Sequence, residues 1–581
     1  MKRSNLMSLM LILMLVSLYP MGHTSRKNGA PHAMAALTMA GRQAQGNAPP
    51  EVQKAQALIQ AKDYDEAIKI LEAYLKQNPN RYATWNILAS AYLQKGDYDR
   101  AIETYQKVLP VPPLKPQAWY NIGAIYALKN NQEEAFKYLQ MVRETGSFDM
   151  EQILTDQRLK DLRSDARFEK LIPKPEEFAD PFVEKVKIIH QWVGEAKGSQ
   201  FGWIARRIGD VDGDKISDFT TSAPTYQVNG QPAGRVYVYS SKSGKLLWAQ
   251  TGQPGESLGM GVEWAGDTNA DGIPDVVAGA PTGDKAYVYS GKDGKVLLRL
   301  AASGSGEGFG THVSTVGDVN GDKHDDVLIG APGNNTSGQG AGRAYIFSGK
   351  DGSFLLSIDG EKANDAYGYA VAGYKDKKHS FIIVGAPGGG PKNTGRVYVY
   401  EGLSRKPKFV FDSDETGGRF GGMFLSVVGD VNGDKVPDIY ASDWQNNAKG
   451  ISTGRIYIYS GKDGQQLFVL TGETQFDGFG IGVADAGDVN RDGYADLIIG
   501  AWQHSSAARS GGKVYLYSGK DRSLLQTYTG RIPGETFGFD ATGMGDVDGD
   551  GVIDFLLTSA WSGIKGFQSG RVYIVSGKVA R

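Results

Sequence analysis

Residues 309–332 read FGTHVSTVGDVNGDKHDDVLIGAP. The stretch opens on an aromatic-glycine pair, Phe309-Gly310, and continues through an apolar run, a loop of closely spaced carboxylates and a second apolar run that ends in Gly-Ala-Pro. Two short apolar runs joined by a polar, glycine-containing loop predict a pair of adjacent β-strands. The fold therefore depends on how often this stretch recurs.

Related stretches recur in register along the last two thirds of the chain. Each begins with an aromatic or leucine residue followed by glycine, and the starts are Phe201, Leu258, Phe309, Tyr367, Phe420, Phe479 and Phe537. A third strand recurs as Gly-Arg-Val-Tyr-Val-Tyr at 234–239 and 395–400, and a Ser-Gly-Lys-Asp-Gly turn leads to a fourth. Seven units of four short strands predict a radial, all-β array.

The seventh unit ends after its third strand, but a matching fourth strand stands upstream of the first unit. Lys187 to Gly194 (KIIHQWVG) aligns with Lys245 to Gly252 (KLLWAQTG). Pairing the first strand with the last unit would remove two exposed sheet edges. We therefore predict that residues 183–581 form a seven-bladed β-propeller closed by an N-terminal strand.

Six of the seven units carry the pattern Asp-x-Asp/Asn-x-Asp-x-x-x-Asp between their first two strands. The carboxylates and amides at positions 1, 3, 5 and 9 are Asp210, Asp212, Asp214, Asp218; Asp267, Asn269, Asp271, Asp275; Asp318, Asn320, Asp322, Asp326; Asp430, Asn432, Asp434, Asp438; Asp488, Asn490, Asp492, Asp496; and Asp546, Asp548, Asp550, Asp554. The fourth unit has Lys375-Asp376-Lys377-Lys378 instead, so we predict that it binds no metal.

Oxygen donors at positions 1, 3, 5 and 9, with a carbonyl at position 7, favour Ca²⁺ over Mg²⁺ and over soft metals. Helices and an acid at position 12 would be needed for an EF-hand, and neither is expected here. The alternative is six turns stabilised by Asp and Asn side chains without metal. We predict about six structural Ca²⁺ sites, because closely packed carboxylates repel one another unless a cation is present.

The N-terminal segment has the pattern of an export signal. Lys2 and Arg3 precede an apolar run from Leu6 to Tyr19, which is too short for a typical membrane-spanning helix. We predict a signal peptide at 1–24, a flexible linker at 25–50, and a secreted, periplasmic or cell-surface location without a later membrane span.

A helical pattern with a period of 34 residues precedes the β-region. Trp85 and Trp119 are 34 residues apart, as are Ala67, Ala101 and Ala135. Small residues at such positions allow two helices to approach closely. We predict all-α repeats at 51–145, followed by a helical cap and linker at 146–182.

Both repeats resemble known families. The helical period with its Trp, Tyr, Ala and Pro positions resembles tetratricopeptide (TPR) repeats, and the paired Phe-Gly and Gly-Ala-Pro elements resemble FG-GAP repeats of the integrin alpha-subunit propeller. The second resemblance implies a fold and a metal rather than a ligand. The first implies a peptide groove to which Asn86 and Tyr120 would contribute; alternatively, the short array acts only as a spacer or packs against its neighbour.

In a four-stranded meander, the carboxylate loops lie on one face of a propeller and the variable loops between strands two and three lie on the other. Trp444, Trp502 and Trp561 begin that variable loop in three consecutive units. They are candidates for a surface that recognises a protein or a glycan. Alternatively, they fill gaps between blades.

Composition excludes several functional classes. The chain has no cysteine, and its 63 basic and 65 acidic residues give a net charge of −2, which offers no reason to expect a nucleic-acid partner. Common catalytic motifs are absent and the seven histidines are scattered. We predict a non-enzymatic, exported, calcium-stabilised binding or adhesion protein. The alternatives are a secreted hydrolase or lyase that acts at the central channel, and a cell-envelope assembly factor.

Overall fold

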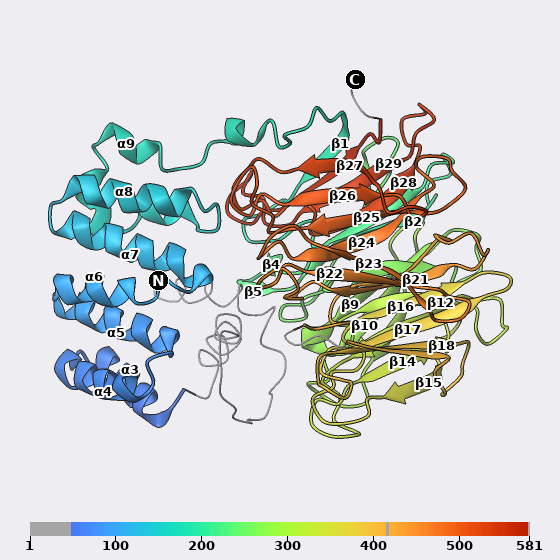
Figure 1. Cartoon of the computed structure of the whole chain (residues 1–581), viewed down its shortest axis with the longest axis horizontal. Helices are drawn as coiled ribbons and strands as arrows, with labels where there is room; N and C mark the ends of the chain where they lie inside the picture. The colour runs from blue at the N-terminus through green and yellow to red at the C-terminus, as the bar shows by residue number, and fades with distance from the viewer. Residues whose placement is uncertain (1–47, 414–417, 579–581) are drawn as a thin grey trace. The chain divides into compact units, whose positions relative to one another are not determined.

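A computed structural model describes residues 48–413 and 418–578, which form two compact units divided between Lys174 and Pro175 (Figure 1). The predicted signal peptide, 1–24, and nearly all of the predicted linker, 25–50, lie outside the described residues. Among the residues that are described, no helix is both long enough and apolar enough to cross a bilayer.

The N-terminal unit consists of three antiparallel helix pairs, which confirms the predicted helical repeats. The pairs are α3 (Pro50–Gln60) with α4 (Tyr64–Gln77), α5 (Tyr82–Lys95) with α6 (Tyr98–Gln106), and α7 (Lys115–Leu128) with α8 (Gln132–Arg143). The second helix of each pair begins at a capping side chain that accepts a backbone N–H, and these caps, Asp63, Asp97 and Asn131, again lie 34 residues apart. Ala67, Ala101 and Ala135 are fully buried, as close helix packing requires.

A short irregular segment follows the third pair. After η1 (Pro112–Leu114), which precedes α7, the later turns are η2 (Met150–Leu154), η3 (Gln157–Leu162) and α9 (Ala166–Glu169). Their apolar side chains, including Ile153, Leu159 and Leu162, join a cluster with Trp119 and Phe136. The segment therefore covers the apolar end of the helical array.

The second unit contains seven four-stranded antiparallel sheets, which confirms the predicted propeller. The innermost strands are β2 (Ala205–Gly209), β8 (Val262–Gly266), β12 (Val313–Gly317), β16 (Val371–Lys375), β20 (Leu425–Val428), β24 (Phe479–Gly487) and β28 (Ala541–Gly545). The second strands are β3 (Asp218–Ala223), β9 (Asp275–Ala280), β13 (Asp326–Ala331), β17 (Ser380–Ala386), β21 (Asp438–Asp443), β25 (Asp496–Ala501) and β29 (Asp554–Ser559).

The third strands are β6 (Arg235–Tyr239), β10 (Lys285–Tyr289), β14 (Arg343–Phe347), β18 (Arg396–Glu401), β22 (Arg455–Tyr459), β26 (Lys513–Tyr517) and β30 (Arg571–Val575). The outer strands are β7 (Leu246–Thr251), β11 (Val296–Ala301), β15 (Phe354–Asp359), β19 (Phe409–Asp412), β23 (Gln466–Thr471), β27 (Leu524–Thr529) and β1 (Ile188–Val193). The remaining elements are η4 (Pro175–Phe178), η5 (Pro281–Gly283) and the small hairpin of β4 (Gln227–Val228) with β5 (Gln231–Pro232).

The innermost strands follow one another around a ring. Each contacts the next, from β2 through β28, and β28 contacts β2. The outer strand of the last sheet is β1, which pairs antiparallel with β30, so that Trp192 lies opposite Val572. The compact unit that holds the propeller starts at Pro175, and Phe182 within it packs against the rings of Phe537 and Tyr573.

The aromatic-glycine pairs join successive blades. Tyr367 of the fourth blade forms a parallel bridge with Gly342, which stands just before β14 of the third blade, while its ring packs against Tyr398 of its own blade. Gly342 has a φ of +84°, and a Cβ atom there would lie 2.2 Å from the Tyr367 carbonyl oxygen. The recurring glycine before the third strand is therefore required by the backbone of the next blade.

Candidate cation-binding loops and interaction surfaces

The six carboxylate loops lie between the first and second strands of their blades, as the sequence predicted. In the first loop, Asp210 at position 1 accepts the backbone N–H groups of Gly213 (2.7 Å) and Lys215 (2.8 Å), and Asp214 accepts that of Ile216. The bond from the position-6 N–H to the position-1 carboxylate recurs in the other five loops. Each loop is thereby wound so that its short acidic side chains bond to its own backbone.

The position-9 aspartate is the most constrained residue of each loop. It is the first residue of the second strand and is fully buried in all six blades. In the first blade, one oxygen of Asp218 accepts the N–H of Val211 (2.9 Å), and the other accepts the N–H of Ser241 (3.0 Å) in the turn between strands three and four. The same two bonds recur at Asp275, Asp326, Asp438, Asp496 and Asp554. This carboxylate fastens the loop to the neighbouring turn.

Burial raises the pKa of every position-9 carboxyl, because the ionised form has lost its water. The pKa rises to about 7 at Asp218 and Asp438 and to about 6 at Asp275, Asp326 and Asp554. Nearby loop carboxylates raise it further, whereas the two backbone N–H groups lower it. A cation in the loop would favour the ionised form.

Two loops bring three carboxylates close enough to hold one metal ion. The ligand oxygens of Asp210, Asp212 and Asp218 lie within 4.8 Å of one another, and so do those of the corresponding residues Asp546, Asp548 and Asp554. These are the loops with aspartate at position 3, where the other four have asparagine. An all-oxygen donor set of this kind fits a hard divalent cation.

The fourth blade has a short turn in place of the loop. Asp376 follows β16 directly, and its carboxylate accepts the N–H groups of Lys378 (2.6 Å) and His379 (2.7 Å) before β17 begins. The turn thus contains one carboxylate, which the local backbone and His379 already bind.

The three predicted tryptophans lie together at one end of the propeller. The ring centroids of Trp502 and Trp561 are 5.2 Å apart, and those of Trp444 and Trp502 are 6.1 Å apart. Trp203 and Phe539, both buried, lie beneath them, with Phe539 4.9 Å from Trp561. We call these five residues the aromatic cluster.

Sequence reasoning missed Trp203 and Phe539, although a signal was available. Each stands two residues after the aromatic residue of its blade's aromatic-glycine pair, in the first and the seventh blades. The three predicted tryptophans are half-buried. They therefore pack against one another and also present indole surface to solvent.

Charged groups also lie along the innermost strands, and the sequence analysis did not predict them. Arg206 pairs with Glu263 (Nε–Oε2 3.0 Å) and, through Nη1, with the fully buried Asp540. Burial raises the pKa of Glu263, and the Arg206 guanidinium opposes that shift. Because the one guanidinium of Arg206 pairs with a carboxylate of each neighbouring blade, the arrangement is first a bridge between three blades.

The predicted groove residues of the helical unit differ in accessibility. Asn86 on α5 is half-buried. Tyr120 on α7 is only 3% exposed, since its hydroxyl donates to Asp156 (2.7 Å) and Arg158 stacks over its ring. We therefore correct the expectation for Tyr120: the segment after α8 covers it, so it is not on an open groove surface.

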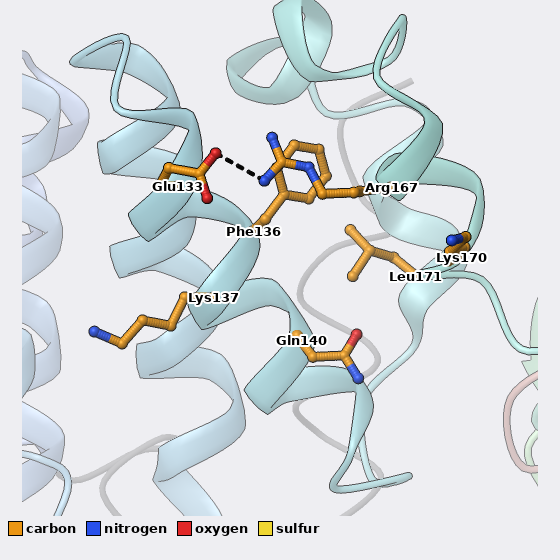
Figure 2. A pocket seen from close by; sticks show the side chains of 7 residues that line it. All are labelled: Glu133, Phe136, Lys137, Gln140, Arg167, Lys170 and Leu171. Carbon is orange, nitrogen blue, oxygen red and sulfur yellow. Dashed lines mark hydrogen bonds and ion pairs between the residues drawn. The ribbon is translucent and has the colours of Figure 1, made fainter.

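A pocket of about 320 Å³ lies between α8 and α9 (Figure 2). Phe136 and Leu171 form its apolar part, and Lys137 and Lys170 stand at its edge. Arg167 lies over the Phe136 ring at 4.2 Å and pairs with Glu133. The pocket involves α8, the second helix of its pair, rather than the first-helix residues that the sequence suggested.

Known families match both halves of the chain. Tetratricopeptide repeats match residues 52–112 and 116–140, and FG-GAP repeats match residues 309–347 and 482–517. With the observed fold, these matches identify the chain as a protein with TPR repeats followed by an FG-GAP, integrin-alpha-like β-propeller.

Individual relatives resemble part of this chain at low identity. Integrin alpha-4 of Xenopus laevis is 27% identical over 254 residues, 40% of this chain and 23% of that protein. Integrin alpha-8 of Mus musculus is 26% identical over 332 residues, 50% of this chain and 28% of that protein. The human phosphatidylinositol-glycan-specific phospholipase D is 24% identical over 398 residues, 56% of this chain and 46% of that protein. The chain thus spans less than half the length of each of these relatives.

Proposed function

We propose that this chain is an exported, non-enzymatic binding protein whose propeller is stabilised by Ca²⁺ in six loops. The observation that carries the proposal is the repeated loop geometry: six loops with the same donor pattern, each fastened by a buried position-9 aspartate. The residues that would hold the cations are the 24 side chains predicted from the sequence. The cations would neutralise loop carboxylates that otherwise repel one another.

The expected affinity makes these cations structural. Extracellular Ca²⁺ modules bind with Kd of about 10⁻⁴–10⁻³ M. At a free Ca²⁺ concentration tenfold above Kd, each site would stabilise the folded state by about 1.4 kcal/mol, and six sites by about 8 kcal/mol. This is comparable to the whole stability of an ordinary domain, about 5–15 kcal/mol.

We propose the aromatic cluster as the ligand surface of the propeller, on the face opposite the cation loops. Half-buried indoles from three successive blades, packed at an angle against the buried rings of Trp203 and Phe539, would give a rigid surface that loses little entropy on binding. The ligand is a protein or a glycan. The helical unit is a second binding scaffold, with a peptide as its ligand.

A combined protein and glycan array tests this function. The full chain is applied with Ca²⁺ or with EDTA, alongside a Trp502→Ala/Trp561→Ala variant and a Trp264→Ala control, since Trp264 is exposed on another part of the unit, in β8. We expect Ca²⁺-dependent binding that the double variant loses and the control keeps. Equal binding by all three proteins would reject the aromatic cluster as the ligand surface.

The second candidate is an enzyme that acts at the central channel. Two observations favour it: Arg206, Glu263 and Asp540 meet between the innermost strands of three blades, and one relative is named as a phospholipase D. Turnover of any arrayed lipid or glycan substrate, abolished by Glu263→Gln, would favour the enzyme over the binding protein.

Export is tested separately, because residues 1–24 lie outside the described part of the chain. We expect residues 1–50 fused to a reporter that is active only outside the cytoplasm to give activity, and the same fusion with Leu11→Arg and Leu13→Arg to give none.

A further inference from the structure

The cation loop of the seventh blade (the seventh loop, 546–554) differs from that of the first blade (the first loop, 210–218), although both have aspartate at positions 1, 3, 5 and 9. The ammonium of Lys187 lies 2.5 Å from a carboxylate oxygen of Asp548, the position-3 residue of the seventh loop. The Asp548 side chain is only 12% exposed, whereas Asp212, its counterpart in the first loop, is exposed. A lysine side chain is therefore already paired with one of the carboxylates that would bind a cation in the seventh loop.

Lys187 owes this position to the way the last blade is completed. In the first blade, a continuous turn joins strands three and four, and Ser240 N–H donates to the Lys245 carbonyl at 2.9 Å. In the seventh blade, Ser576 N–H donates to the Lys187 carbonyl at 2.9 Å, although β1 comes from the other end of the unit. Lys187 thus takes the place of Lys245 without a covalent turn between the two strands.

The ion pair between Lys187 and Asp548 is specific to the seventh loop and, in the described part of the chain, has no counterpart in the first loop. A turn lysine approaches position 5 in both blades: Lys242 donates to the Asp214 carbonyl at 3.2 Å, and Lys578 lies 3.5 Å from the Asp550 carboxylate. Within the described residues, however, the Lys245 ammonium forms no ion pair with the first loop. The loop of the seventh blade therefore has two ion pairs with lysine, Lys578 with Asp550 at position 5 and Lys187 with Asp548 at position 3, and the pair at position 3 is the shorter.

We infer that Lys187 lowers the affinity of the seventh loop for divalent cations below that of the first loop. The inference rests on the proposed Ca²⁺ function. A cation entering the seventh loop must either displace the ammonium from Asp548 or bind beside a like charge, and both cost free energy. Exposed ion pairs of this kind change an equilibrium by up to about fivefold, and salt reduces the effect.

Hydrogen–deuterium exchange read by mass spectrometry resolves the two loops within the full chain. The backbone amides of peptides covering 210–218 and 546–554 are followed while Ca²⁺ is titrated into the metal-free protein at low ionic strength. We expect protection of 546–554 to require a higher Ca²⁺ concentration than protection of 210–218. In Lys187→Gln, the midpoint for 546–554 should fall about threefold to fivefold, while that for 210–218 stays unchanged.

Lys245→Gln is the matched control, because it removes the equivalent lysine of the first blade and should shift neither midpoint. Lys187 is 64% exposed, so Lys187→Gln should leave exchange elsewhere in the propeller unchanged, which the same experiment reports. An unchanged 546–554 midpoint in Lys187→Gln, or an equal shift in Lys245→Gln, would overturn the inference. If Ca²⁺ protects neither loop in any variant, the proposed cation function itself fails and this inference fails with it.

Discussion

The first and fourth blades fold into the same kind of four-stranded sheet but connect their two inner strands differently. The first blade inserts a loop of four aspartates between β2 and β3, fastened by Asp218. The fourth joins β16 to β17 through the short turn at Asp376. Sheet formation therefore does not require the carboxylate loop, and the loop has a role of its own, which we propose is cation binding.

A glycine-to-alanine substitution at a blade junction should destabilise the propeller equally whether or not the next blade has a carboxylate loop, because the junctions do not involve the loops. A Cβ atom at Gly342, between blades three and four, would lie 2.2 Å from the Tyr367 carbonyl oxygen, and one at Gly512, between blades six and seven, 2.0 Å from that of Phe537. We expect Gly342→Ala and Gly512→Ala each to lower the free energy of unfolding by about 4 kcal/mol, measured by urea denaturation.

Gly213 provides the control for this pair. It also has a positive φ, +85°, but a Cβ atom there meets nothing within 4 Å, so Gly213→Ala should cost only about 1 kcal/mol. Equal costs at Gly342 and Gly213 would show that the close approach between blades is not what requires glycine.

The two kinds of inner connection should differ in their sensitivity to loss of a carboxylate. Asp218→Ala leaves the buried N–H groups of Val211 and Ser241 without their acceptor and should cost about 3 kcal/mol. Asp376→Ala removes a 37%-exposed side chain from a local turn and should cost about 1 kcal/mol or less. Thermal unfolding of both variants in Ca²⁺ measures the difference, and a cost at Asp376 as large as that at Asp218 would contradict it.

A smaller effect is expected at the junction of the third and fourth blades, where His312 Nδ1 accepts the Val371 N–H at 3.5 Å. Burial and the Arg206 charge lower the pKa of His312 to about 4 from 6.5. The unfolded chain protonates His312 more readily than the folded chain does. The contribution of the neutral His312 to the free energy of unfolding is therefore fully present above pH 6.5 and is lost as the pH falls towards about 4.

His312→Gln removes the titrating group. Melting temperatures of the wild type and of this variant, recorded from pH 7 to pH 4, should diverge, with the wild type losing more as the pH falls. Parallel profiles would show that His312 does not titrate differently in the folded and unfolded chains.

Features that repeat in register were predictable from the sequence. The seven blades, the carboxylate positions and the shared location of Trp444, Trp502 and Trp561 all follow from aligning the units. The helical repeats followed from the period of Trp85 and Trp119 in the same way.

Features that depend on contacts between distant residues were not predictable. The second bond of Asp218 reaches Ser241 across a blade, and Arg206 meets Asp540 only because the ring brings the first and last blades together. Lys187 reaches Asp548 for the same reason. Tyr120 was predicted on an open groove because the 34-residue repeat places it on the first helix of a pair. The segment that covers it does not repeat, so the alignment of repeats could not show it.

Calorimetric titration of the metal-free full chain with Ca²⁺, paired with melting temperatures in Ca²⁺ and in EDTA, tests the central claim most directly. Six filled loops predict uptake of about six Ca²⁺ ions per chain and a large rise in the melting temperature of the propeller. No heat of cation binding, together with identical melting in Ca²⁺ and EDTA, would contradict the account.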